Sequence, residues 1–241
     1  MKNYRKLVLT GLAGLTLASS AYAYVLLSPA RTWDSSPTYI VDDRGNATVT
    51  DSDGGVSATV GAIKAWGSVV SAQAGSVASW QLGDGIPMLN FRDPERVCKG
   101  SCLAATFTGF YNQRNDGSYR IFDADIVTNT RYDFTSTGED DGCSGEFFIE
   151  GVQVHEVGHG LGLGHSNVVG STMYPSVSSC DNGPATLSND DKAAIQELYG
   201  GGGGGNGGGG NGGSCDLAQK GESCSSDGEC CSGRCRNNSC K

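Results

Sequence analysis

Apolar residues recur at helical spacing in one early segment of the chain, at Val56, Val60, Ile63, Trp66 and Val70. Intervals of three and four residues place these side chains on one face of a helix, one turn after another. We therefore expect a long amphipathic helix over this segment, with its apolar face turned toward the core.

Shorter apolar runs predict strands on both sides of that helix. One run covers residues 37–41, and three more cover residues 86–91, 103–111 and 119–127. Their length and their content of β-branched and aromatic residues are typical of strands rather than of helices.

Two more helices are expected in the second half of the chain. One should run from Phe147 to about Gly162, and the other should begin after Ser188. The Ser188 side chain can cap that last helix together with Asp191, three residues later. Strands gathered early, with helices between and after them, indicate an α+β fold.

The N-terminal residues 1–23 have the pattern of a secretory signal peptide. A basic stretch precedes an apolar run over residues 7–18, which is shorter than the ~20 residues that a membrane-spanning helix needs. Small residues at Ala21 and Ala23 then frame a cleavage site. We expect an exported protein whose mature chain begins near Tyr24.

A glycine-rich segment over residues 200–214 divides the rest of the chain into two units. Glycine loses the most backbone entropy on ordering and buries nothing, so this segment is predicted to be a flexible linker. Residues 24–199 are enough for a hydrophobic core, whereas residues 215–241 are too few. The net charge of −9 argues against nucleic acid and anionic membrane surfaces as partners.

Ten cysteines agree with disulfide formation in an exported protein. Four of them lie in the large unit, where three pairings are open in principle. Cys98 and Cys102 bracket a tight loop, while Cys143 and Cys180 lie before and after the segment that contains the histidines. We favour one bridge within each of these two pairs.

The other six cysteines lie in the small unit, at Cys215, Cys224, Cys230, Cys231, Cys235 and Cys240. A unit of this size must be cross-linked to fold. The spacing, with its adjacent pair, resembles the inhibitor cystine knot, or knottin, which implies bridges 215–231, 224–235 and 230–240. Fifteen pairings exist in principle, and a structural metal site is the competing interpretation. We expect an accessory module that binds substrate, a cell surface or another protein.

All three histidines lie within the segment HEVGHGLGLGH. His155 and His159 stand four residues apart, so on a helix both imidazoles project from one face and can bind one zinc ion. Glu156 lies where a general base can take a proton from an activated water. Gly162 can end the helix with a positive φ, which lets His165 return as a third ligand.

An idle histidine cluster and a purely structural zinc site are the competing interpretations of this motif. Structural zinc sites usually have four protein ligands, and no fourth is evident beside these three. A set of three histidines leaves one coordination position for water. The pattern therefore favours a catalytic zinc.

The motif over residues 155–165 resembles the zinc signature of the metzincin endopeptidases. Ser166 directly after it resembles the matrixin branch, and residues 171–175, Ser-Thr-Met-Tyr-Pro, resemble the Met-turn of that branch. Weaker likenesses extend over residues 30–200. The short N-terminal lead favours a bacterial secreted member of the branch.

The resemblance implies a twisted mixed sheet, a long active-site helix and peptide hydrolysis with one catalytic zinc. Met173 would pack beneath the ligands as an apolar floor. An extended substrate would pair with an edge strand at Leu103, Ala104, Ala105, Thr106 and Phe107. Its side chains would be selected by a pocket with walls from Tyr174, Pro175 and the loop that begins at Ser176.

Some features depart from the pattern of that family. In matrix metalloproteinases, histidines on two neighbouring strands bind a second, structural zinc, but here Ala105 and Ile121 occupy the matching places. We therefore expect that zinc to be missing. Asp123, Asp125 and the acidic run over residues 139–141 could bind calcium, but we favour solvated surface carboxylates. No cysteine lies upstream to keep the enzyme latent, so latency of that kind is not expected.

These observations together predict a secreted, monomeric zinc metalloendopeptidase that cleaves internal bonds of extracellular proteins. Two alternatives belong to other classes. In the first, the small unit binds a partner and the zinc unit is an inert carrier. In the second, the small unit is an inhibitor or toxin released from a precursor. Glu156 argues against an inert carrier, because metal binding alone does not need that carboxylate.

Overall fold

The structure is a computed structural model that describes residues 23–77, 83–136 and 143–200, together with two short strands near the C-terminus. These strands, β9 (Cys235–Arg236) and β10 (Ser239–Cys240), pair with each other in antiparallel fashion. The predicted leader up to residue 22 and almost all of the linker lie outside the described residues. The three bridges expected in the small unit also involve cysteines outside them.

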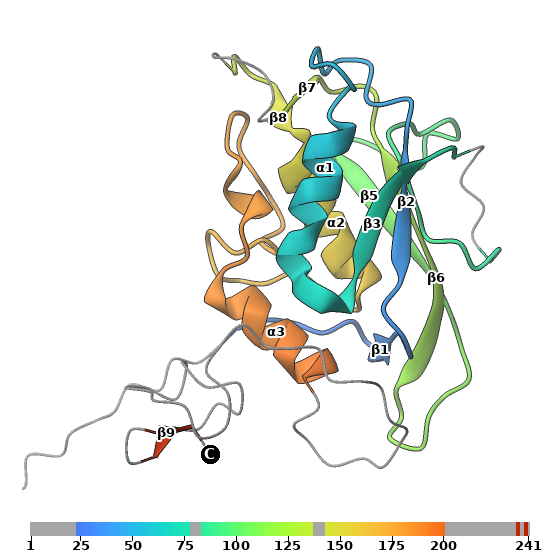
Figure 1. Ribbon diagram of the computed structural model, residues 1–241, viewed down its shortest axis with the longest axis vertical. Coiled ribbons are helices and arrows are strands. Elements are labelled where there is room, and N and C mark those ends of the chain that lie inside the picture. The colour runs from blue at the N-terminus through green and yellow to red at the C-terminus, as the bar shows by residue number, and fades with distance from the viewer. Residues whose placement is uncertain (1–22, 78–82, 137–142, 201–234, 237–238, 241) are drawn as a thin grey trace, which may run out of the picture.

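A six-stranded mixed sheet forms one layer of the large unit (Figure 1). Its strands are β1 (Arg31–Thr32), β2 (Thr38–Asp42), β3 (Ser71–Gly75), β4 (Met88–Asn90), β5 (Ala104–Tyr111) and β6 (Tyr119–Thr128). The order of hydrogen-bonded neighbours is β1-β6-β4-β2-β3. β5 also pairs with β6, along almost its whole length from Arg120 to Thr128. Only β5 runs antiparallel to its neighbour, and its outer edge has no strand partner in the described part of the chain.

Two α-helices pack against each other and against the sheet (Figure 1). α1 (Val56–Ile63) contacts β3 and α2 (Ile149–Gly160), and α2 contacts β5. Helices that cover a mixed sheet agree with the predicted α+β class. This layering places one face of α2 directly over the edge strand, and the site is built at that contact.

The prediction of one long helix over residues 56–70 was wrong. The α-helix ends at Ile63, and a 3₁₀ segment, η1 (Lys64–Val69), follows it. Gly67 inside η1 has a φ of 70°, which interrupts helical geometry, so Val70 lies in extended backbone. Trp66 is nevertheless buried, and its indole N–H donates to the carbonyl oxygen of Val154 at 2.9 Å.

The four predicted strands correspond to β2, β4, β5 and β6, with ends shifted by one or two residues. The pattern missed β3 because residues Ser71–Gly75 are small or polar and mostly solvent-facing. It also missed β1, which is only two residues long and pairs with Tyr119 and Arg120 of β6.

α2 is shorter than predicted at both ends. Phe147–Phe148 form β8, which pairs in parallel with β7 (Phe134–Thr135), so the helix starts at Ile149. At its other end, the carbonyl oxygen of Gly160 accepts a hydrogen bond from Trp33 Nε1 at 2.8 Å. The next carbonyl, of Leu161, accepts from the Tyr199 hydroxyl at 2.7 Å. Side chains thus satisfy carbonyls that a helix end leaves without intrahelical partners.

The predicted start of the last helix is confirmed. α3 (Asn189–Tyr199) follows Ser188, whose side chain accepts from the backbone N–H of Asp191, and Asp191 in turn accepts from the backbone N–H of Ser188. A short 3₁₀ turn, η2 (Gly183–Ala185), precedes it. Such a reciprocal box contributes about 1 kcal/mol to helix stability.

One continuous core holds these layers together. Tyr39, Ile63, Leu89, Ile126 and Val157 come from different elements and are each fully buried within it. Complete burial of a large aliphatic side chain contributes roughly 1.5–3 kcal/mol. Within the described residues, no helix has the length and apolar character needed to cross a membrane.

Two disulfides tie loops to this framework. Cys98 is bonded to Cys102, and Cys143 is bonded to Cys180, which is the pairing favoured from the sequence. The first bridge closes the loop before β5. The second joins the segment before β8 to the segment that follows the histidine-bearing region.

Candidate metal centre and adjoining cleft

The three histidine side chains converge on one point. His155 and His159 come from successive turns of α2, and His165 comes from the segment that follows the helix. One ring nitrogen from each of the three lies within 4.8 Å of the other two. The Nε2 atoms of His159 and His165 are 3.2 Å apart.

Gly162 makes the return of the chain to His165 feasible. Its φ is +106°, and a Cβ at this position would lie 2.2 Å from the carbonyl oxygen of Arg31. Only glycine tolerates both conditions. The N-terminal segment then holds this turn, because the N–H of Leu27 donates to the Gly162 carbonyl and the N–H of Gly164 donates to the Val25 carbonyl.

Backbone carbonyls orient two of the rings. His155 Nδ1 lies 2.6 Å from the carbonyl oxygen of Thr172, and His159 Nδ1 lies 2.8 Å from that of Leu163. A carbonyl can only accept, so each Nδ1 carries the proton and each Nε2 presents a lone pair. Burial lowers the pKa of both rings to about 4, so both are neutral at neutral pH.

This donor set fits a zinc ion. Tetrahedral zinc with Zn–N bonds of ~2.0–2.1 Å places neighbouring nitrogens about 3.3 Å apart, close to the separation found for His159 and His165. Neutral imidazoles with their second nitrogen bonded to a carbonyl are the usual form of a histidine metal ligand. Without a cation between them, the lone pairs of neighbouring Nε2 atoms would face one another with nothing to bind.

Glu156 lies next to this cluster and is 6% exposed. It lines a cavity together with His155 and His165. Burial raises the pKa of its carboxyl group, whereas His159 and a hydrogen bond from Thr106 act in the opposite direction. A carboxylate in these surroundings can exchange a proton with a molecule in the cavity.

Met173 lies under the helix turn that bears the ligands. It is 2% exposed, and a Cβ on Gly158 of α2 would lie 2.3 Å from its sulfur. The start of α3 fixes this position, because Asp191 Oδ1 accepts from the N–H of Met173 at 3.0 Å and Oδ2 accepts from the N–H of Thr172 at 2.8 Å. Met173 is therefore packed against the helix that bears two of the histidines.

A mainly apolar cavity of about 470 Å³ opens beside Glu156. It brings together Leu103 and Ala104 with Tyr174, Pro175 and Ser176, five of the predicted substrate-binding residues. Sequence reasoning missed other residues that line it, namely Tyr132, Phe147, Gly151 and Val152. Phe147 and the two α2 residues are close in the sequence, and Tyr132 joins them from the loop after β6, where its ring packs edge-on against that of Phe147.

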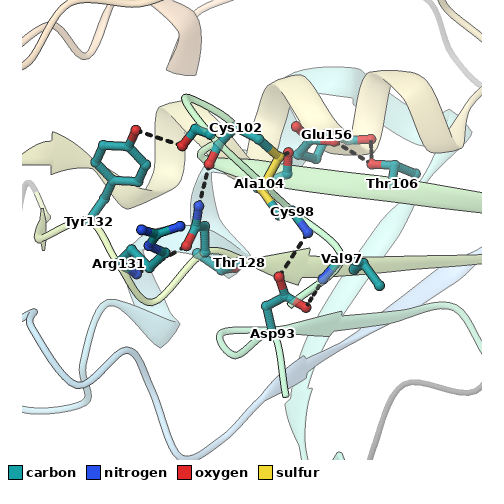
Figure 2. The surroundings of a disulfide bond; sticks show 12 residues. Asp93, Val97, Cys98, Cys102, Ala104, Thr106, Thr128, Arg131, Tyr132 and Glu156 are labelled. Atoms are coloured by element: carbon teal, nitrogen blue, oxygen red, sulfur yellow. Dashed lines mark hydrogen bonds between the residues drawn. A yellow bond between two sulfur atoms is a disulfide. The ribbon is translucent and has the colours of Figure 1, made fainter. Parts of the chain in front are cut away.

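The remaining predicted substrate-binding residues, Ala105, Thr106 and Phe107, lie on β5 but do not line that cavity. Thr106 instead faces α2, where its hydroxyl lies 2.6 Å from Glu156 Oε2 (Figure 2). No sequence signal points to this contact, because it depends on how α2 packs over β5.

The segment before β5 is braced on two sides. Asp93 accepts hydrogen bonds from the N–H groups of Val97 and Cys98 at 2.9 Å, next to the Cys98–Cys102 bridge (Figure 2). Asn129, just after β6, donates through Nδ2 to the Cys102 carbonyl at 2.7 Å and through its backbone N–H to the Leu103 carbonyl at 2.8 Å. The start of the edge strand is therefore held rigidly beside the cavity.

Asp123 and Asp125 are not the solvated surface carboxylates that we favoured, because both are fully buried. They lie on the same face of β6, where one is bonded by the segment before β4 and the other by the first residue of β4. Asp123 accepts from the backbone N–H of Gly83 at 2.5 Å, and Asp125 accepts from that of Met88 at 3.1 Å. The acidic run over residues 139–141 lies outside the described residues.

Comparison with known proteins gives a consistent result for this region. The family model described as Matrixin matches residues 79–200, about half of the chain. Matrilysin of Rattus norvegicus is 44% identical over 68 residues, which are 28% of this chain and 24% of that protein. Metalloendoproteinase 5-MMP of Arabidopsis thaliana is 51% identical over 53 residues, which are 22% of this chain and 14% of that protein.

A human relative shows the same limited overlap. Matrix metalloproteinase-27 of Homo sapiens is 40% identical over 73 residues, which are 30% of this chain and 14% of that protein. The chain thus matches about a quarter or less of the length of each of these relatives.

Proposed function

The chain belongs to the matrixin family, and we propose that it is a zinc-dependent endopeptidase that cleaves internal bonds of extracellular proteins. The observation that carries this proposal is the meeting of three histidine nitrogens beside a buried glutamate at the mouth of a cavity. A structural metal site would not need that glutamate, whereas hydrolysis does.

In this proposal His155, His159 and His165 hold the metal through Nε2. Zinc bound there supplies a Lewis acid, which brings the pKa of a water molecule toward ~7 and polarises the scissile carbonyl. Glu156 takes the proton of the attacking water on a carboxylate oxygen and then passes it to the departing amine. The Thr172 and Leu163 carbonyls keep two of the imidazoles aligned throughout.

Substrate would bind in extended form along the outer edge of β5, which has no strand neighbour among the described residues. Backbone groups of residues Leu103–Phe107 lie along this segment, and a peptide can add to an edge strand as one more strand. One substrate side chain would enter the apolar cavity beside Tyr174 and Pro175. The volume of about 470 Å³ favours a large apolar side chain at that position.

We extend the proposal to the organisation of the whole chain. Residues 1–23 would direct secretion, residues 24–199 would form a monomeric catalytic domain, and residues 200–214 would tether a knottin-like module of residues 215–241. That module would hold substrate, a cell surface or another protein near the catalytic domain.

Replacement of Glu156 by Gln tests the proposal directly. We expect the wild-type protein to cut a peptide library, with cleavage lost on chelation of zinc and regained when zinc is restored. The Glu156→Gln variant should bind zinc equally well and cleave at least about 10²-fold more slowly, because Gln cannot accept the proton. Mass spectrometry of the digests and metal analysis give both readouts.

The matched control is Glu197→Gln on α3, an exposed carboxylate changed in the same way, which should cleave at the wild-type rate. Cleavage by Glu156→Gln at the wild-type rate would disprove the assigned base. A wild-type protein that leaves the library intact in the presence of zinc would remove the endopeptidase proposal and leave the binding-module alternative.

A further inference from the structure

Thr106 makes a contact with Glu156 that the histidine motif does not account for (Figure 2). Its hydroxyl oxygen lies 2.6 Å from Glu156 Oε2 and 2.8 Å from the backbone oxygen of the same residue. A hydroxyl has one proton and can donate to only one of these oxygens at a time. Donation to an ionised carboxylate is charge-assisted, so it is preferred over donation to the carbonyl.

This hydrogen bond fixes one of the two carboxylate oxygens of Glu156. With Oε2 held by Thr106, the carboxylate cannot swing freely, and this bond leaves the second oxygen for a molecule in the cavity that Glu156 lines. A glutamate side chain has three rotatable bonds, so its carboxylate keeps one orientation only if a neighbouring group holds it there.

The donor itself sits on a rigid support. Threonine is β-branched and therefore stiff at χ1. Thr106 lies opposite Ile126 in the β5–β6 ladder, and the start of β5 is held by Asn129 and by the Cys98–Cys102 bridge. A group held on a well-braced strand can preorganise another group without reorganisation during the reaction.

We propose that Thr106 is a positioning residue that holds the Glu156 carboxylate in the orientation needed for proton transfer. The inference rests on the proposed function of Glu156 as the general base. Thr106 does not touch substrate through this hydroxyl. It affects kcat, and it does not affect the binding of zinc or of peptide.

The test replaces Thr106 by Val, which keeps the shape of the side chain and removes the hydroxyl, and by Ser, which keeps the hydroxyl. We expect Thr106→Val to lower kcat about tenfold or more while KM changes less than about twofold. Thr106→Ser should recover kcat to within about threefold of wild type. Zinc content should equal that of wild type in both variants, and a crystal structure of Thr106→Val should show the carboxylate turned away or in several conformers.

Thr108→Val is the matched control, because Thr108 lies on the same face of β5 and its hydroxyl accepts from Arg31 and not from Glu156. It should leave kcat and KM unchanged. If Thr106→Val does not fold, Thr106→Ala serves in the same comparison.

The proposal is overturned if folded Thr106→Val or Thr106→Ala retains wild-type kcat, or if Thr106→Ser is as slow as Thr106→Val. It is also overturned by an unchanged carboxylate position in the variant crystal structure. That crystallographic readout does not depend on activity. An inactive wild-type protein would therefore refute the endopeptidase function, and the crystal structure of Thr106→Val would still decide whether Thr106 holds the carboxylate.

Discussion

Single residues decide where the donor atoms of the site point. Two carbonyl oxygens, of Thr172 and Leu163, select the ring tautomers of His155 and His159. Gly162 then makes the turn that delivers the third ring. The effect of Gly162 depends on the absence of a side chain, so the addition of a single methyl group is enough to test it.

Replacement of Gly162 by Ala should disrupt both folding and metal binding. The positive φ and the 2.2 Å approach of a Cβ to the Arg31 carbonyl make the change cost more than about 1 kcal/mol of unfolding free energy. Zinc affinity should fall as well, because the displaced turn carries His165. Urea denaturation and zinc titration measure the two effects.

Gly61→Ala on α1 is the matched control. A Cβ there meets nothing within 4 Å, and alanine is the better helix former, so stability should rise by about 0.5–1 kcal/mol. If Gly162→Ala were as stable as wild type and bound zinc normally, the strained turn would not be required.

At the scale of elements, α3 links helix capping to the geometry of the site. Asp191 completes the capping box at Ser188 and also accepts hydrogen bonds from the N–H groups of Thr172 and Met173. One buried carboxylate thus joins the start of α3 to the segment beneath the histidines. The Thr172 carbonyl that orients His155 belongs to the same segment.

Comparison of Asp191→Ala with Ser188→Ala should separate these two roles. Ser188→Ala removes only the cap and should cost about 1 kcal/mol of unfolding free energy, with zinc affinity unchanged. Asp191→Ala also leaves two buried N–H groups without a partner, so it should cost at least about 1–3 kcal/mol more and weaken zinc binding. Equal effects of the two changes on stability and on zinc titration would show that Asp191 acts only as a cap.

For the whole molecule, the two disulfides differ chiefly in the length of chain that they close. Cys98–Cys102 spans a sequence separation of 4, whereas Cys143–Cys180 spans 37 and encloses the histidines and Met173. A bridge that closes a longer loop removes more entropy from the unfolded chain. The second bridge should therefore contribute more to global stability, and the first should mainly secure the edge strand.

Replacement of both cysteines of a bridge by Ser measures this difference. The chain-entropy relation predicts a loss of about 4 kcal/mol for the 143–180 pair and about 2 kcal/mol for the 98–102 pair. Chemical denaturation of each double variant gives the values. A larger loss for the 98–102 pair would show that local bracing of β5 outweighs loop closure.

The amino-acid sequence alone determined the features that depend on local spacing. The histidine motif, the cap at Ser188, four strands and the Cys98–Cys102 bridge all follow from residues at short separations. Local backbone geometry and side-chain chemistry are enough to specify these features, whatever surrounds them.

Only the tertiary structure decided which distant residues meet. The contact of Thr106 with Glu156, the aromatic lining from Tyr132 and Phe147, and the burial of Asp123 all arise where one layer covers another. The pairing of the polar strand β3 likewise depends on its neighbour in space, β2. Periodicity shows which face of an element is apolar, but packing determines what that face touches.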